Sequence, residues 1–152
     1  MVSPKDTELV DKLEKILERH KQERVCVVGT TCTGKSYLKK HIPSAQDMDE
    51  LIFPKLSVEE AKYVMRKPWT EDVGKTMIRL VKERIKIEPG RPVFGTVVIP
   101  SDYIIYLTIS DALLKERTEK RGKRYQDAKN MQVQLEEEIK RSRIHYEELV
   151  VG

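Results

Sequence analysis

Apolar residues along this chain follow two patterns, the helical spacing of amphipathic helices and the continuous runs of buried strands. The opening segment, residues 1–21, is predicted to form an amphipathic helix, because five apolar residues repeat there at helical spacing: Leu9, Val10, Leu13, Ile16 and Leu17. The run Val25-Cys26-Val27-Val28 is unbroken and ends at a glycine. Such a run is typical of a strand buried on both faces of a parallel sheet. We expect a helix to follow from Gly34 to about His41.

The middle of the chain is also predicted to alternate between strand and helix. A short second strand is expected within residues 44–50, with Asp47 and Asp49 near its end. Apolar spacing predicts helices over residues 57–65 and 70–87, which Pro68-Trp69 separates. Strands alternating with helices predict an α/β fold in layers around a mainly parallel sheet of four or five strands.

Two stretches rich in β-branched and aromatic residues, 92–99 and 103–109, are predicted to be strands. Only Pro100-Ser101-Asp102 separates them, whereas neighbouring parallel strands need a crossover of about a dozen residues. Either the two strands are antiparallel, or one is much shorter than the pattern indicates. Ser110 is expected to cap a helix that continues through Arg121, and a last helix is expected over about 128–149.

Composition restricts the class of protein. The 152 residues suffice for a single domain spanning 1–152, and 39% hydrophobic with 36% charged residues is typical of a globular chain. No apolar run approaches the ~18 residues that a membrane span requires, and no signal peptide is recognisable, so we expect a cytoplasmic protein without a membrane partner. Cys26 and Cys32 fit a reducing compartment. The net charge of +4 favours an anionic partner such as a nucleotide, a phosphosugar or nucleic acid.

The segment GTTCTGKS, residues 29–36, has the spacing of a phosphate-binding loop and lies between a predicted strand and a predicted helix. Glycines allow the backbone N–H groups to turn inward around phosphates, Lys35 can reach β- and γ-phosphate oxygens, and the Ser36 hydroxyl can bind Mg²⁺. We therefore expect a nucleoside triphosphate, ATP with Mg²⁺, on one continuous set of residues: Gly29, Thr30, Thr31, Cys32, Thr33, Gly34, Lys35, Ser36 and Tyr37.

Two further groups carry candidate catalytic chemistry. Asp49, or else Asp47, can accept a proton from an attacking hydroxyl, and Asp47 can hold Mg²⁺ through water. The alternative is that these acids only cap the next segment or are solvated. Residues 115–129 contain seven basic and three acidic side chains, which suggests a lid at about 115–130 whose Arg117 and Arg121 face an anion. The alternative is an ordinary solvated helix face.

An acceptor pocket is a third expectation, from Arg66, Trp69 and Arg79. An arginine can hold a phosphate or carboxylate, and the indole can stack on a ring. Packing of Trp69 in the core is the alternative.

Two stretches resemble the P-loop kinases, the group that includes nucleoside monophosphate kinases, shikimate and gluconate kinases, and polynucleotide 5′-hydroxyl kinases. They are the loop with Asp47-Met48-Asp49-Glu50, and YIIYLTISDALLKERTEKRGKR at residues 103–124. The resemblance implies a three-layer P-loop NTPase fold, and it implies lid arginines four residues apart that contact the transferred phosphate, as Arg117 and Arg121 are spaced. The sequence departs from the group because it lacks a helix before the fourth strand, and the chain is expected to end where a fifth strand would begin.

Three functions remain open. The first is a kinase that transfers the γ-phosphate of Mg-ATP to a small-molecule or nucleotide acceptor. The second is a polynucleotide 5′-hydroxyl kinase, which the basic balance favours, although no aromatic platform for bases is evident. The third is an ATPase or nucleotide-binding module without an acceptor.

Overall fold

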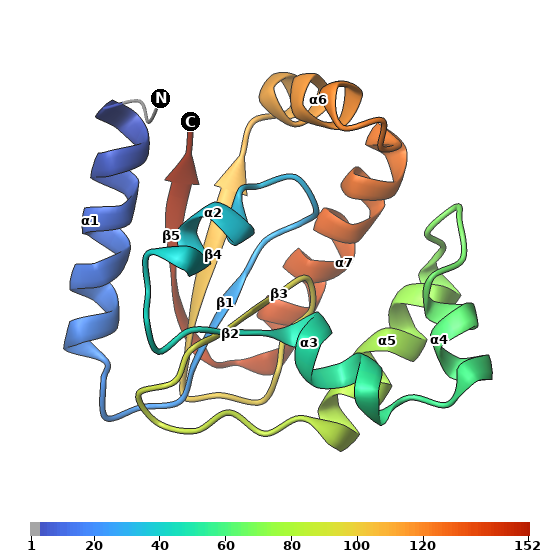
Figure 1. The fold of residues 1–152 in the computed structure, drawn as a ribbon, viewed down its shortest axis with the longest axis horizontal. Coiled ribbons are helices and arrows are strands. Elements are labelled where there is room, and N and C mark those ends of the chain that lie inside the picture. Colours follow the sequence, from blue (N-terminus) through green and yellow to red (C-terminus); the bar gives the residue numbers. More distant parts are fainter. Residues whose placement is uncertain (1–3) are drawn as a thin grey trace.

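The structure, a computed structural model, describes residues 4–152, so the first three residues of the predicted 1–21 segment lie outside the described residues. Its centre is one sheet of five strands in the order β2-β3-β1-β4-β5, in which every pairing is parallel (Figure 1). The strands are β1 (Val25–Val28), β2 (Gln46–Asp47), β3 (Val93–Gly95), β4 (Tyr103–Ile109) and β5 (His145–Val151). The predicted α/β class with a mainly parallel sheet is confirmed.

Helices cover both faces of this sheet. One face packs against α1 (Pro4–Arg19), α2 (Lys35–Lys40) and α6 (Asp111–Lys120). The other packs against α3 (Met48–Ile52), the 3₁₀ turn η1 (Phe53–Lys55), α4 (Val58–Val64), α5 (Glu71–Arg84) and most of α7 (Tyr125–Ser142). The helices expected at 1–21, 34–41, 57–65, 70–87 and 110–121 are therefore present, with slightly different ends.

Strand β1 lies at the centre of the sheet. Its four residues are all buried, and they alternate between the two layers: Val25 and Val27 join the core beneath α1 and α2, whereas Cys26 and Val28 join the core beneath α5 and α7. The prediction of a strand buried on both faces is confirmed. The loop that follows β1 therefore begins at the buried centre of the sheet.

The stretch 92–99 is mostly not a strand. Only Val93–Gly95 pairs, and β1 separates β3 from β4, so the two strands are parallel and are not neighbours. Of the two alternatives above, the short strand is right and the antiparallel pair is wrong. The remaining apolar residues, Val97, Val98 and Ile99, are buried in the core on the α5 side. Residues 96–102 thus cross from β3 to β4 without a helix, as the sequence predicts.

The last segment differs from the expected single helix over 128–149. Helix α7 ends at Ser142, where Arg143 takes a left-handed conformation with φ 56°, and residues 145–151 pair with all of β4. A fifth strand is therefore present, and the expectation that the chain ends before it was wrong. Apolar residues in 144–151 fit a helical spacing about as well as a strand, so periodicity alone could not decide.

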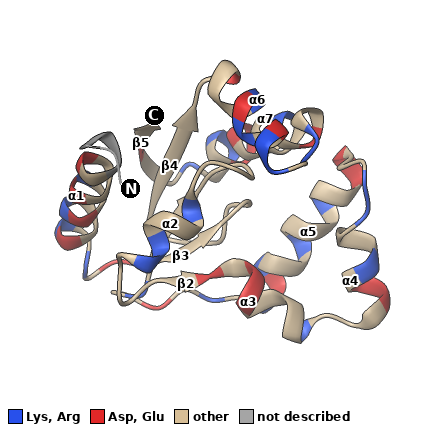
Figure 2. Ribbon diagram, turned by 45° about the horizontal axis from the view of Figure 1, so that its top comes forward, with Lys and Arg blue, Asp and Glu red and all other residues tan. Residues whose placement is uncertain are grey.

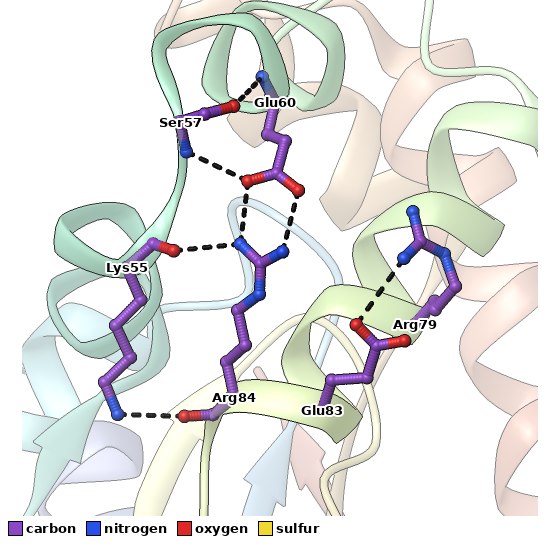
Figure 3. Close-up of polar contacts among 6 residues, drawn as sticks. All are labelled: Lys55, Ser57, Glu60, Arg79, Glu83 and Arg84. Carbon is purple, nitrogen blue, oxygen red and sulfur yellow. Dashed lines mark hydrogen bonds and ion pairs between the residues drawn. The ribbon is translucent and has the colours of Figure 1, made fainter.

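Polar side chains join the helices of the second layer. Arg84 at the end of α5 donates two hydrogen bonds to Glu60, of 2.7 and 2.8 Å, and one to the Lys55 carbonyl, while Lys55 donates to the Arg84 carbonyl (Figure 3). Glu60 also forms a capping box with Ser57. We call these four residues the Arg84 bracket. It fixes the start of α4 against the end of α5.

Candidate functional site

The carboxyl ends of the five parallel strands meet at one edge of the sheet, where ligands of open α/β sheets bind. The 29–36 loop leaves β1 at this edge, β2 ends there at Asp47, and Thr96 follows β3. A cavity of about 150 Å³ lies between these segments and is lined by several of the predicted residues, namely Lys35, Ser36, Asp47, Asp49 and Arg121. Basic segments of α2 and of the α6–α7 turn lie on one side of the site, and the acidic start of α3 on the other (Figure 2).

The loop has the backbone geometry that its glycines predict. Gly34 has φ 95°, in the left-handed region that favours glycine. A Cβ atom at Gly29 would lie 2.8 Å from Thr33 Oγ1 and 3.1 Å from Leu107 Cβ, so β4 leaves no room for a side chain there. The Thr33 hydroxyl donates to the Thr30 carbonyl at 2.9 Å, which closes the loop internally.

Lys35 turns back onto this loop. Its Nζ donates to the carbonyls of Gly29 and Thr30, each at 2.7 Å, and approaches Thr33 Oγ1 at 3.3 Å. Among the side chains that the structure describes, no carboxylate forms an ion pair with it. Burial lowers the pKa of Lys35 to about 8, against the opposing charges of Asp49 and Asp47. The cation is therefore held by carbonyl oxygens, and the two aspartates act on it without forming an ion pair.

The two acids occupy different positions. Asp47 caps α3, since its carboxylate accepts from the Asp49 N–H at 2.8 Å, so the capping role considered above is present. Asp49 lies in the first turn of α3 at the mouth of the cavity. Asp49 is exposed as a residue, but partial desolvation of its carboxylate raises its pKa, the Asp47 charge raises it further, and Lys35 opposes both. Glu50 turns to Lys39, 3.7 Å away.

The predicted lid arginines both lie at the loop. Arg117 of α6 donates to the carbonyls of Thr33, at 3.1 Å, and Cys32, at 3.5 Å. Arg121, at the end of α6, lines the cavity and helps to keep the pKa of Lys35 low. The turn between α6 and α7 comprises residues 121–124, within the predicted lid of 115–130.

A second cavity, of about 370 Å³, lies beside the first. Cys32, Gly34 and Arg121 line both cavities, so the loop forms the wall between them. Tyr37 of α2 and Arg117 also line the second cavity. A hollow of about 830 Å³ lies far from the loop, near the start of β1, and its lining mixes acidic and basic side chains without any of the predicted residues.

The residues predicted for an acceptor pocket are not brought to the loop. Trp69 lies in the core with 9% of its surface exposed, and its indole N–H donates to Gln134 at 2.9 Å. It therefore packs in the core, which was the alternative to ligand stacking. Arg66 lies over the ring of Tyr63, and Arg79 pairs with Glu83 at 3.5 Å (Figure 3). None of the three lines either cavity at the loop.

The sequence reasoning missed three contributors. Thr96, Phe94 and Lys39 line the first cavity. Because β3 ends at Gly95, Thr96 lies at the carboxyl edge of the sheet. The sequence did not indicate this end, since the apolar run continues to Ile99. The hydrogen bond from the Thr30 hydroxyl to the Ala128 carbonyl, which ties the loop to α7, has no signal in the sequence.

In residues 4–152, no group of three or more His, Cys, Asp and Glu side chains is arranged to hold a metal ion, and no helix is long and apolar enough to cross a membrane. Neither a family model nor a curated protein matches the chain.

Proposed function

We propose that this chain is a P-loop kinase with the three-layer fold of that class, which transfers the γ-phosphate of Mg-ATP to a small-molecule or nucleotide acceptor. The observation that carries the proposal is the convergence of a Gly-x₄-Gly-Lys-Ser loop with separate acidic and basic side chains. The loop leaves the buried central strand, and Lys35, Asp49 and Arg121 line one cavity beside it. Phosphoryl transfer needs these parts, because it is catalysed mainly by positioning and by charge stabilisation.

The donor phosphates would take the inner side of the loop. Lys35 then exchanges its two carbonyl partners for phosphate oxygens, and the anion raises its lowered pKa again. The cavity of about 370 Å³ is in the size range of ligand pockets and accepts the nucleoside, with Tyr37 and Arg117 in its lining.

The residues present fit magnesium. Mg²⁺ keeps several waters and usually takes only one or two protein ligands beside phosphate oxygens, so a dedicated cluster of acids is not needed. The Ser36 hydroxyl would bind the ion directly, and the Asp47 oxygen that does not cap α3 would hold one of its waters. When bound, the ion neutralises charge on the phosphates.

In the proposed reaction, Asp49 receives the proton of the acceptor. Its raised pKa brings the carboxylate closer to the range in which a general base is effective at neutral pH. As the acceptor oxygen bonds to the γ-phosphorus and the bond to the β-phosphate oxygen breaks, Arg121 offsets charge on the transferred group.

The test is transfer of label from γ-labelled ATP with magnesium to nucleoside monophosphates, nucleosides, hydroxy acids, sugars and 5′-hydroxyl oligonucleotides. Lys35→Ala serves as the inactive variant. Lys62→Ala, an exposed lysine on α4, serves as the matched control. Label on one small-molecule or nucleotide acceptor supports the proposal. Label only on oligonucleotides would make the chain a polynucleotide kinase, and release as free phosphate would make it an ATPase.

A further inference from the structure

The two edges of the sheet differ in what they leave open. At one edge, β2 has only two residues. At the other, β5 has seven residues, all in register with β4, and no described strand pairs with its outer side. In a parallel strand, alternate residues direct both their N–H and C=O groups to the same side, so β5 presents a row of free backbone groups outward.

A groove runs along this open edge. Its volume is about 380 Å³, and it is lined by four consecutive β5 residues, 147–150, together with Lys12, Lys15, Ile16 and Arg19 of α1. Side chains of a strand alternate between faces, so four consecutive lining residues show that the groove follows the strand's edge. The α1 residues form one stripe at helical spacing, and α1 stands beside β5 at the outside of the sheet (Figure 1).

The helix side of the groove is basic. Lys12, Lys15 and Arg19 are exposed, and among the described side chains neither lysine has a carboxylate within ion-pairing distance. Arg19 reaches Glu147 at 3.5 Å, and Glu147 also accepts from the Tyr103 hydroxyl at 2.7 Å. Two of the three cations therefore remain available to an anionic partner.

The opposite face of β5 presents Tyr146, Glu148 and Val150, which are all exposed. Leu149 and Val151 point toward α1 and are buried, whereas Tyr146 and Val150 point the other way and are 45% and 69% exposed. A strand added to this edge would thus meet cations on its α1 face. On its other face it would meet Tyr146 and Val150 with the Glu148 carboxylate between them, which favours apolar over acidic residues there.

We infer that β5 binds an extended segment of a partner protein as a sixth strand, and that this segment alternates acidic with apolar residues. Backbone hydrogen bonds to β5 supply the pairing, acids contact Lys12 and Lys15, and apolar side chains cover Tyr146 and Val150. None of the residues that line the groove lines either cavity at the loop. This inference therefore does not depend on the proposed kinase activity.

Charge argues against a second copy of the chain at this edge. Pairing of two β5 strands about a two-fold axis would bring the two α1 stripes toward each other across the axis, with cations facing cations. Like charges in that position are destabilising. An acidic segment has the opposite effect.

The probe is a capped, fluorescein-labelled peptide of about ten residues in which glutamate and valine alternate, matched to the seven residues of β5. Its control replaces each glutamate by lysine. We expect fluorescence anisotropy to show binding of the acidic peptide that is at least about tenfold tighter than binding of the basic one, because only the former complements the stripe. Amide hydrogen exchange should slow in β5 when the acidic peptide binds.

The double substitution Lys12→Glu and Lys15→Glu should weaken binding of the acidic peptide at least about tenfold. Lys62→Glu with Lys86→Glu makes the same change of charge at exposed lysines outside the groove and should not. N-methylation of alternate peptide amides separates pairing from charge attraction, since only one of the two methylation patterns should abolish binding. Equal binding of both peptides, insensitivity to the groove substitutions, or a dimer whose β5 amides are already protected would overturn the inference.

Discussion

Arg84 and Lys35 both donate to backbone carbonyls, and they differ in whether a carboxylate also pairs with them. Arg84 has the Lys55 carbonyl and both oxygens of Glu60 (Figure 3). Lys35 has the carbonyls of Gly29 and Thr30 and no ion pair among the described residues. The pKa of Glu60 falls to about 2 because Arg84 favours its charged form, whereas burial lowers the pKa of Lys35 to about 8.

The difference separates a structural site from a candidate binding site. The charge at Arg84 is matched within the fold, so a ligand would gain little there. Lys35 is half-buried and has no ion pair among the described residues, so an anion that reaches it would offset the lowering of its pKa by burial. Four experiments test this difference, and they are given in order of decreasing expected effect.

The largest effect should come from Lys35→Ala. If Lys35 serves the ligand, phosphoryl transfer should fall by about 10³-fold or more while the melting temperature stays unchanged. Transfer from labelled ATP and a thermal melt measure the two quantities. Arg84→Ala should show the reverse, with a lower melting temperature and retained transfer. Similar losses of stability in both variants would contradict the contrast.

If the proposed phosphoryl transfer occurs, Arg121→Ala should lower kcat by about 10²-fold, because it would remove one donor to the transferred group. Lys123→Ala is the matched control, since Lys123 is exposed in the same turn and lines neither loop cavity. Steady-state kinetics with saturating ATP distinguish the two. A rise in KM for ATP at constant kcat would instead place Arg121 in donor binding alone.

The pKa of Lys35 predicts how ATP affinity changes with pH. Lys35 is charged below about pH 8 and loses its proton above it, so affinity should fall toward about tenfold per pH unit in alkaline solution. Titration of a fluorescent ATP analogue between about pH 7 and 9.5 measures this. Lys35→Ala should abolish this dependence. A flat profile in the unmodified protein would show that no group at the loop titrates in this range.

The smallest effect concerns the Arg84 bracket in acid. The pKa of Glu60 is lowered from its ordinary 4.5 to about 2, so its contribution to stability is present above pH 4.5 and is lost as the pH falls toward 2. Relative to Glu60→Gln, the unmodified protein should lose its advantage over this range in acid unfolding followed by circular dichroism. Added salt should reduce the advantage, since the two side chains are 29% and 30% exposed. If the unmodified protein remains more stable than Glu60→Gln at pH 2, the charge of Glu60 is not the source of the difference.

Most elements of the first half of the chain were predictable because local signals agreed there. The apolar run 25–28 and the glycines of the loop each specify their structure locally, and in the second half the cap at Ser110 does the same for α6. The second half was less predictable. Residues 97–99 resemble a strand because they are buried and β-branched, but they fill the core as an irregular crossing.

The residues of the candidate site were also only partly predictable from the sequence. The 29–36 loop was evident from spacing alone, and the structure places Asp49 and Arg121 beside it. Trp69, however, was a candidate for ligand stacking only because its partners on α7 are distant in sequence. Its backbone N–H donates to Asp127 and its indole to Gln134, contacts that only the folded chain brings together. Thr96 was missed because the end of β3 depends on pairing with β1.

The position of β1 at the centre of the sheet also bears on how the protein is made. Both neighbours of β1 come from far along the chain, since Cys26 pairs with Val93 on one side and with Ile104 on the other. A ribosome that has released only the first half of the chain has therefore released the whole 29–36 loop but neither strand that supports it. The loop should acquire its folded geometry only late in synthesis, after β4 has emerged, and the proposed nucleotide binding would have to wait until then.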